Sequence, residues 1–270
     1  MKISIRRKDF ESLGSLNVSC EDGVVLIDFG DDSGQMQTVN GKPIIPIPMA
    51  SPLNTLDHLS WREIESIGLS GRARELFALG ATKTDHMKNG FDAVWKIIGF
   101  DHDYLADGSG KAPISWDMVK AYKDEWAMND EATNDGGWDR CKANQRMNTE
   151  LLSLCSDELQ AIIKPVIKLT SAGSKSSEII KSICKLWLKS EKELFGRCYY
   201  SAPGEGHWYE YYRQEDVPYF ATNAEGERVW QWLRSALYDR DDSFCFVATD
   251  GSACYYNAYY SAALLPGFSC

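Results

Sequence analysis

Residues 236–270 of the chain are "ALYDRDDSFCFVATDGSACYYNAYYSAALLPGFSC". Tyr255, Tyr256, Tyr259 and Tyr260 stand there among Asn, Ser and Ala, with no regular apolar spacing that would assign them to a core. Segments rich in Tyr, Ser, Gly and Asn are typical of binding surfaces whose partner varies, because tyrosine gives a large amphipathic contact area with few rotatable bonds. The tail therefore predicts a binding surface.

The same tail lacks five residue types. From Ser235 to Cys270 there is no Lys, Glu, Gln, Met or Trp, although all 7 Met and all 9 Trp of the chain precede it. These are the amino acids whose codons all end in a purine. Codons of the form A-A-pyrimidine, mutated at their adenines, yield Tyr, Asp, Ser, Cys or Asn but never these five. The alphabet indicates adenine-directed mutation; a chance bias in a Lys-poor, Tyr-rich β segment is the alternative.

The overall composition is that of a globular protein, with 44% hydrophobic and 25% charged residues. A net charge of −10 disfavours a nucleic-acid binder, which needs a basic face, and disfavours adsorption to anionic membranes. No window approaches 18 apolar residues, so we expect no membrane insertion. The start, "MKISIRRKDF", lacks the apolar stretch of a secretory signal, and we expect none.

Motifs for catalysis or metal binding are weak. The 8 cysteines form no CxxC pair, which predicts buried thiols rather than a zinc site or a disulfide scaffold. The acidic "YDRDDS" at 238–243 lacks the Gly and terminal Glu of a calcium loop. His102 stands between Asp101 and Asp103, but neighbouring strand residues point to opposite faces, so we expect a polar turn there. No nucleophile elbow or phosphate-binding motif occurs. The sequence therefore predicts no enzyme, no cofactor and no metal.

The sequence pattern changes near residue 52. Residues 1–52 alternate β-like runs, "VVLIDFG" and "PIIPIPM", with turn residues, which predicts a small β-rich segment for attachment or assembly. Further on, Ser60 and Glu63 form a capping box ahead of a helical pattern, and "FDAVWKIIGFDHDYL" predicts a strand. "MNTELLSLCSDELQAIIKPVIKLT" predicts a helix followed, past Pro165, by an extended run.

The segment "SSEIIKSICKLWLKSEKELFG" leaves two alternatives open. Lys181, Lys185 and Lys189 have the spacing of a solvated helix face, whereas "CKLWLKS" alternates as a strand would. In the second case Ser190 and Glu193 would cap a new helical turn.

Several motifs, taken in order, resemble one family. "GGWDRCKANQRMN", "KLWLKSEKELFG", "EGHWYEYY", "WQWLRSA" and "FCFVATDGSA…ALLPGF" are similar to bacterial and phage proteins of uncharacterised function, over about residues 58–270. The usual tail contains W-W-L-R-S and a closing G-V-x-P-x-F; here Gln231–Trp232 and Leu264–Leu265 depart from it. Members with this alphabet resemble the variable proteins of diversity-generating retroelements, in which adenine-directed mutagenesis rewrites ligand-contacting codons.

The resemblance implies an α+β protein with a C-type-lectin-like fold of the formylglycine-generating-enzyme type. Residues 53–270 would form this domain, with short strands, long loops and a few helices, and would display a diversified face at 237–263. Trp230 and Trp232 are expected in the core, and Arg234 is expected to be structural. The ligand-binding residues that the resemblance implies are Tyr238, Asp239, Arg240, Asp241, Asp242, Phe246, Ala248, Thr249, Ser252, Cys254, Tyr255, Tyr256, Asn257, Tyr259, Tyr260 and Ala262.

We therefore expect a non-enzymatic receptor-recognition protein that binds a cell-surface protein or glycan. A phage particle or a bacterial cell surface would carry it, and its oligomeric state stays open. Two alternatives remain: a cysteine-oxidising enzyme on the related fold, for which Cys245 and Cys254 are the candidates, and a fixed calcium-dependent lectin.

Overall fold

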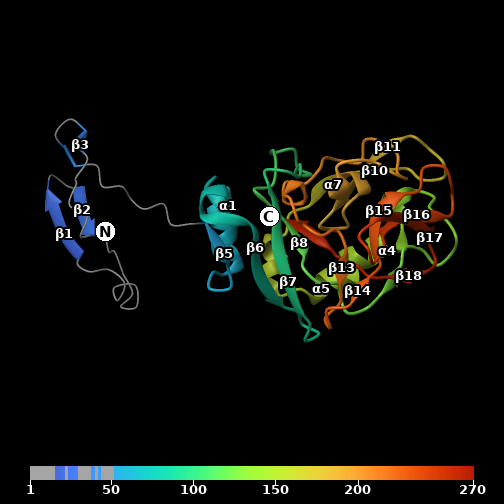
Figure 1. Cartoon of the computed structure of the whole chain (residues 1–270), viewed down its shortest axis with the longest axis horizontal. Coiled ribbons are helices and arrows are strands. Elements are labelled where there is room, and N and C mark those ends of the chain that lie inside the picture. Colours follow the sequence, from blue (N-terminus) through green and yellow to red (C-terminus); the bar gives the residue numbers. More distant parts are fainter. Residues whose placement is uncertain (1–15, 22–23, 30–37, 40–41, 44–51) are drawn as a thin grey trace. The chain divides into compact units, whose positions relative to one another are not determined.

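The computed structural model describes residues 16–21, 24–29, 38–39, 42–43 and 52–270, in two compact units that divide after Ser51 (Figure 1). The first unit contains two antiparallel pairs, β1 (Leu16–Glu21) with β2 (Val24–Phe29) and β3 (Thr38–Val39) with β4 (Lys42–Pro43). The first six residues of the run "VVLIDFG" thus form a strand, as its β-branched residues predict. Most of "PIIPIPM" lies outside the described residues.

The second unit is α+β, as predicted, with mostly short strands and a few helices. Its largest element is a six-stranded sheet in the order β12-β19-β8-β7-β6-β5, antiparallel except for the β5–β6 pair. These strands are β5 (Leu53–Thr55), β6 (Phe77–His86), β7 (Asp92–Phe100), β8 (Ile114–Met118), β12 (Leu186–Trp187) and β19 (Gly267–Ser269).

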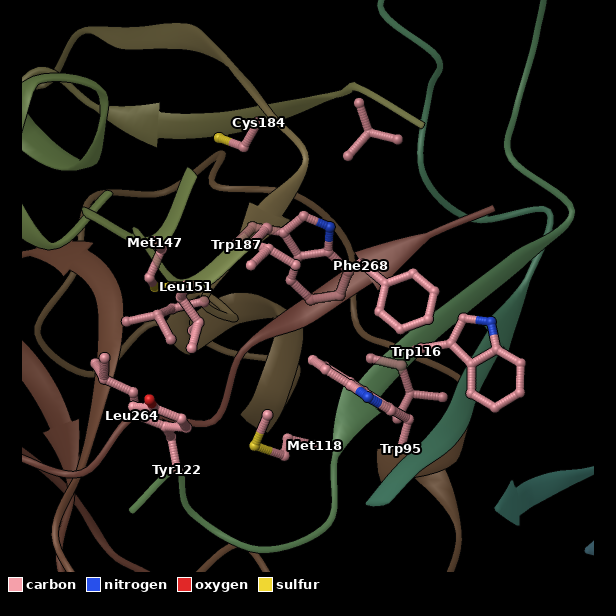
Figure 2. Packing of buried hydrophobic residues seen from close by; sticks show 14 of the residues in the cluster. Trp95, Trp116, Met118, Tyr122, Met147, Leu151, Cys184, Trp187, Leu264 and Phe268 are labelled. Atoms are coloured by element: carbon pink, nitrogen blue, oxygen red, sulfur yellow. The ribbon is translucent and has the colours of Figure 1, made fainter. Parts of the chain in front are cut away.

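The last strand, β19, lies inside this sheet rather than at its edge. Its Phe268 pairs with Trp116 of β8 on one side and with Leu186 of β12 on the other. Figure 2 shows Phe268 among Trp95, Trp116 and Trp187, and its ring centroid is 4.9 Å from that of Trp95. Truncating a buried aromatic side chain of this kind costs roughly 3–5 kcal/mol. The end of the chain is therefore part of the core.

The remaining strands form smaller sheets. β15, β16 and β17 make a three-stranded antiparallel sheet, and the others pair as β10–β11, β13–β14 and β9–β18. Their bounds are β9 (Trp126–Ala127), β10 (Val166–Ser171), β11 (Ile179–Cys184), β13 (Ala221–Thr222), β14 (Arg228–Val229), β15 (Gln231–Ala236), β16 (Ser243–Val247), β17 (Ala253–Asn257) and β18 (Ser261–Ala262).

The helices are short. They are α1 (Trp61–Leu69), α2 (Ala73–Leu76), α3 (Gly137–Arg140), α4 (Lys142–Arg146), a π-helical turn η2 (Met147–Leu151), α5 (Leu152–Leu154), α6 (Asp157–Ile162), α7 (Glu191–Phe195) and a 3-10 turn η3 (Tyr211–Arg213). α1 begins with the predicted capping box, in which Ser60 accepts from the Glu63 amide and Glu63 accepts from the Ser60 amide.

The predicted helix after Arg146 is present but interrupted. The chain stays helical through α5 and then turns at Cys155 and Ser156, whose backbone is extended. Ser156 caps a new helix, α6, by accepting from the Leu159 amide, and the extended run past Pro165 is β10. A serine that can cap a helix competes with continuation of the previous one, which explains the break.

The ambiguous segment at 176–196 takes the strand alternative. β11 and β12 precede α7, which has the predicted capping box of Ser190 and Glu193. The alternative of a helix with a solvated face of lysines is therefore wrong. Lys181 is exposed, but Lys189 is buried and its Nζ lies 2.5 Å from Oδ1 of Asp117. In the part of the chain that the structure describes, no helix has the length and apolar character needed to span a bilayer.

Candidate binding surface

The β15–β16–β17 sheet carries the tyrosine-rich tail (Figure 1). β16 is the central strand and is buried throughout, while β17 has β16 as its only strand partner among the described residues. Tyr255 pairs with Cys245, and Tyr256 pairs with Phe244. Because successive strand residues point to opposite faces, Tyr255 and Tyr256 belong to different sides of this sheet.

On one side, Tyr256 belongs to an aromatic group. Its ring lies 5.8 Å from that of Trp230 and 4.6 Å from that of Tyr260, which stacks on Tyr259 at 4.5 Å. Trp230 is 45% exposed, and the three tyrosines are similarly exposed. The expectation that Trp230 packs in the core is therefore wrong. Trp230 precedes β15 and lies over Phe246, whereas Trp232 is buried as predicted.

On the other side of the sheet, Tyr255 contacts the segment that follows α7. Its ring centroid is 5.1 Å from that of Tyr200, and the Tyr238 amide donates to the Tyr200 carbonyl oxygen. Tyr199, Tyr200 and Tyr238 are all exposed. Sequence reasoning missed Tyr199 and Tyr200, because nothing in the local pattern "GRCYYSAP" places them beside the tail.

The predicted ligand-binding residues divide by exposure. Most are exposed or half-buried, including the whole run 238–242. Phe246 and Ala262 are buried, at 4% and 5% exposure, so the expectation that they contact a ligand is corrected for these two positions. Phe246 supports Trp230 and Tyr256 from below, and Ala262 pairs with Trp126. The exposed and half-buried positions are Tyr238, Asp239, Arg240, Asp241, Asp242, Ala248, Thr249, Ser252, Cys254, Tyr255, Tyr256, Asn257, Tyr259 and Tyr260.

The loop between β15 and β16, residues 237–242, and the adjoining Ser243 of β16 are held through their backbone. The side-chain amide nitrogen of buried Asn134 donates to the carbonyl oxygens of Arg240 at 2.9 Å and Ser243 at 2.8 Å. The Asn134 main-chain amide donates to the Asp241 carbonyl oxygen at 2.8 Å. The Ala258 amide donates to the carbonyl oxygen of Asp242. None of these bonds uses a side chain of the loop, so these contacts do not depend on which side chains the loop carries.

Asn134 is itself fixed by close backbone packing. Its Oδ1 accepts from the Ser174 amide at 2.8 Å. Gly137 has φ +55, and a Cβ there would lie 1.8 Å from the Ser171 carbonyl oxygen. Gly173 has φ +73, and its Cβ would lie 1.8 Å from the Asn134 carbonyl oxygen. Only glycine tolerates both constraints, which gives a physical reason for the glycine in the "GGW" motif at position 137.

Two buried residues, Asn134 and Glu191, act as clamps, meaning that they bind backbone groups of the surface segments. Glu191 binds the segment that contains Tyr199 and Tyr200. The buried Glu191 carboxylate accepts from the amides of Tyr199, Tyr200 and Ser201 and from the Ser201 hydroxyl. Glu191 is the first residue of α7, and its own amide donates to the Ser235 hydroxyl at 2.9 Å. Here too, backbone groups rather than tyrosine side chains are bound.

Beneath the sheet lies a buried charged cluster, defined by Asp103, Lys168, Glu193, Glu205 and Arg234. The Arg234 guanidinium donates with two nitrogens to the Glu193 carboxylate and also to the carbonyl oxygens of Leu188 and Leu169. Lys168 contacts Asp103 and Glu193, each at 2.8 Å. The structural role expected for Arg234 agrees with its complete burial. The cluster joins the loop after β7 to β10, α7 and β15.

Burial and pairing oppose each other at these carboxylates. Burial would raise the pKa of Asp103 and of Glu193, but nearby Lys168 and, for Glu193, Arg234 hold both pKa values below their usual range. Burial raises the pKa of Glu205, against the opposing effect of Arg234. The polar turn expected around His102 is therefore only partly correct, since Asp103 is a buried member of this cluster.

The two cysteines of the enzyme alternative do not face each other. Cys245 is fully buried, and burial raises the pKa of its thiol well above the usual value. Cys254 pairs with Phe246, so it points to the side opposite Cys245. Within the described residues, no group of three or more His, Cys, Asp or Glu side chains is placed to hold a metal ion.

A cavity of about 460 Å³ lies away from the tyrosine-rich tail, between α1, β6 and α6. Its Asp85 accepts from the Trp61 indole and from the Ser156 amide and hydroxyl, and Lys83 donates to the Leu59 carbonyl oxygen. These polar groups are paired with one another, which accounts for them as links between α1, β6 and α6.

These features define a class of protein: an α+β domain whose last strands carry exposed aromatic residues on a buried, charged framework. Residues 110–269, more than half of the chain, match the family described as a domain of unknown function (DUF6273), and the chain belongs to this family. The matched region begins just before β8 and includes the whole β15–β16–β17 sheet and both clamps. No curated protein and no solved structure matches the chain.

Proposed function

We propose that this protein is a non-enzymatic receptor-recognition protein whose tail, residues 237–263, is diversified by a retroelement. We further propose that residues 53–270 adopt a C-type-lectin-like fold of the formylglycine-generating-enzyme type. Residues 1–52 would serve attachment or assembly on a phage particle or a bacterial cell surface.

One observation carries the proposal: the stretch 237–243 is bound through its carbonyl oxygens and amides, by Asn134 and by the backbone of neighbouring segments. The side chains at 238–242 interact mostly at the surface, as in the pair of Arg240 and Asp242 at 3.0 Å; the half-buried Asp242 also accepts from the Ser243 hydroxyl at 2.7 Å. A loop whose conformation is set by distant fixed residues tolerates substitution, since surface changes away from buried contacts alter stability little. Diversification requires this separation.

The chemistry of the surface supports a protein or glycan partner. Trp230, Tyr256, Tyr259 and Tyr260 offer aromatic faces that stack on apolar side chains or on sugar rings, and aromatic residues dominate binding energy at interfaces. The loop 238–242 adds three aspartates and one arginine, which supply directional polar contacts. Trp230 lies outside the diversified positions, so it would be a constant anchor beside variable neighbours.

The experiment that tests the proposal is deep sequencing of this gene across its source population. We expect substitutions clustered at the codons for 238–242, 255–257 and 259–260, confined to adenines of A-A-pyrimidine codons. Codons 231–235 and 243–245, in the buried strands, serve as the internal control and should be invariant. A tail as uniform as that control would remove the retroelement from the account.

A further inference from the structure

A second cavity, of about 170 Å³, is lined by residues that do not belong to the proposed binding surface. Apolar and aromatic side chains line most of it, among them Tyr211, Tyr212, Tyr219 and Phe220. Three other polar side chains also line it, Lys96 from β7, Thr222 from β13 and Gln231 from β15. An apolar pocket with a few converging polar groups is the usual form of a small-molecule site.

The charges at this cavity do not balance among the described residues. Two lysines share the single carboxylate of Asp117, which is completely buried. Lys189 takes the close position, 2.5 Å from Oδ1, whereas the Lys96 Nζ is 3.5 Å from Oδ2. Oδ2 already accepts a hydrogen bond from the Tyr212 hydroxyl at 2.5 Å. Among the described residues, Lys96 is therefore a mostly buried amine whose one carboxylate neighbour is engaged by other donors; its Nζ otherwise faces the rings of Tyr211 and Tyr212.

Gln231 supplies a second, independent observation. Its side chain is 2% exposed, and its Nε2 donates to the Tyr219 carbonyl oxygen at 2.6 Å. Its Oε1 is buried and has no hydrogen-bond partner among the described residues. A buried acceptor without a donor costs about 1–3 kcal/mol. A ligand that brings a donor to this oxygen would recover that free energy.

We propose that this cavity binds a small carboxylate that also carries a hydrogen-bond donor, such as a hydroxyl. The carboxylate would pair with the Lys96 ammonium and balance its charge, while Asp117 stays paired with Lys189. The hydroxyl would donate to Oε1 of Gln231, and the carbon skeleton would lie against the tyrosine and phenylalanine rings. The positions of Lys96 and Gln231 on two separate sheets mean that such a ligand would also link β7 to β15.

Three matched probes test the site on the unmodified full-length protein: glycolate, acetate and glycolamide. Glycolate has both the carboxylate and the hydroxyl, acetate lacks the hydroxyl, and glycolamide lacks the charge. NMR titration at millimolar probe follows the Lys96 Cε and the Gln231 side-chain amide signals. We expect saturable shifts at both residues, with glycolate binding more tightly than either other probe. Absence of saturable shifts with glycolate, or equal affinity for glycolamide, would overturn the proposal.

Two variants then separate the roles of the polar groups. Lys96→Met removes the ammonium but keeps the chain length, and it should weaken glycolate binding roughly tenfold or more, since a charge-assisted hydrogen bond is lost. Gln231→Met should abolish the preference for glycolate over acetate. Lys123→Met, at an exposed lysine, is the matched control and should bind like wild type. Unchanged glycolate affinity in a folded Lys96→Met protein would contradict the assignment.

Discussion

Arg234 and the loop at 238–242 are almost adjacent in the chain, yet the fold specifies them in opposite ways. The Arg234 side chain is fully buried and meets a carboxylate and several carbonyl oxygens. In the loop, the backbone carries the contacts and the side chains are exposed. The comparison shows that one stretch of sequence can hold a buried side chain with many polar partners and, a few residues later, a loop fixed mainly through its backbone.

The largest effect is expected inside the charged cluster. Among the described residues, Arg234→Met leaves Glu193 with Lys168 as its one cationic partner and removes the donor to buried carbonyl oxygens, so we expect a loss of about 3–5 kcal/mol in the free energy of unfolding. Urea denaturation measures it. Arg240→Met is the matched control, because its pair with Asp242 is at the surface, and its urea midpoint should equal that of wild type. A similar loss in both variants would erase the contrast.

Removing the clamp on the loop is expected to have a smaller but clear effect. Asn134→Ala removes the side-chain donor to the carbonyl oxygens of Arg240 and Ser243, of which Ser243 keeps the Leu237 amide, for a loss of about 1–3 kcal/mol in the free energy of unfolding. Hydrogen exchange should speed up at the Leu237 and Ala258 amides, which bond within the loop region. Asn223→Ala, at a turn away from the loop, should leave those amides as slow as in wild type. Slow exchange in both variants would mean that Asn134 does not hold the loop.

The cluster also predicts a dependence of stability on pH. Asp103 and Glu193 have lowered pKa values in the folded protein, so their contribution is complete above the unfolded-state pKa of about 4 and is lost as pH falls below it. Each adds about 1.4 kcal/mol per pH unit to that slope. Glu205, with its raised pKa, is protonated in both states there and adds nothing. Below pH ~4, Asp103→Asn should reduce the slope of unfolding free energy against pH by about 1.4 kcal/mol per pH unit, the contribution of one proton. An unchanged slope would contradict the pairing of Asp103 with Lys168.

The smallest effect is expected at the aromatic surface. Replacing Tyr256, Tyr259 and Tyr260 together by Ser removes exposed rings that meet mainly one another, and the melting temperature should change little. Replacing the buried Phe246 by Ser, on the same side of the sheet, should lower it sharply. Differential scanning calorimetry distinguishes the two outcomes. A large loss in the tyrosine variant would mean that these rings support the fold.

Local patterns predicted the local structure well. The capping boxes at Ser60 and Ser190 and the strand around Trp95 follow from short-range spacing, and all three are present. The opposite sides of Tyr255 and Tyr256 follow from strand alternation once the strand is known. Trp230 was misjudged because a tryptophan next to a strand gives no signal of which side is covered.

Long-range polar partners could not be predicted. Lys189 is buried because Asp117 meets it from a strand far away in the sequence, and the lysine spacing alone indicates a solvated face. Asn134 likewise binds a loop about a hundred residues later. Its sequence context, "NDGG", indicates a turn but carries no information about the partner. Such contacts depend on tertiary structure rather than on local propensity.

The most direct test of a replaceable surface on a fixed frame compares two libraries of the full chain. One randomises residues 238–242, and the other randomises the adjacent buried strand, 243–247. Protease resistance of displayed variants measures the fraction that folds. The account predicts that most members of the first library fold and that few of the second do. Equal folded fractions would contradict it, because the loop side chains would then specify the structure as strictly as the core does.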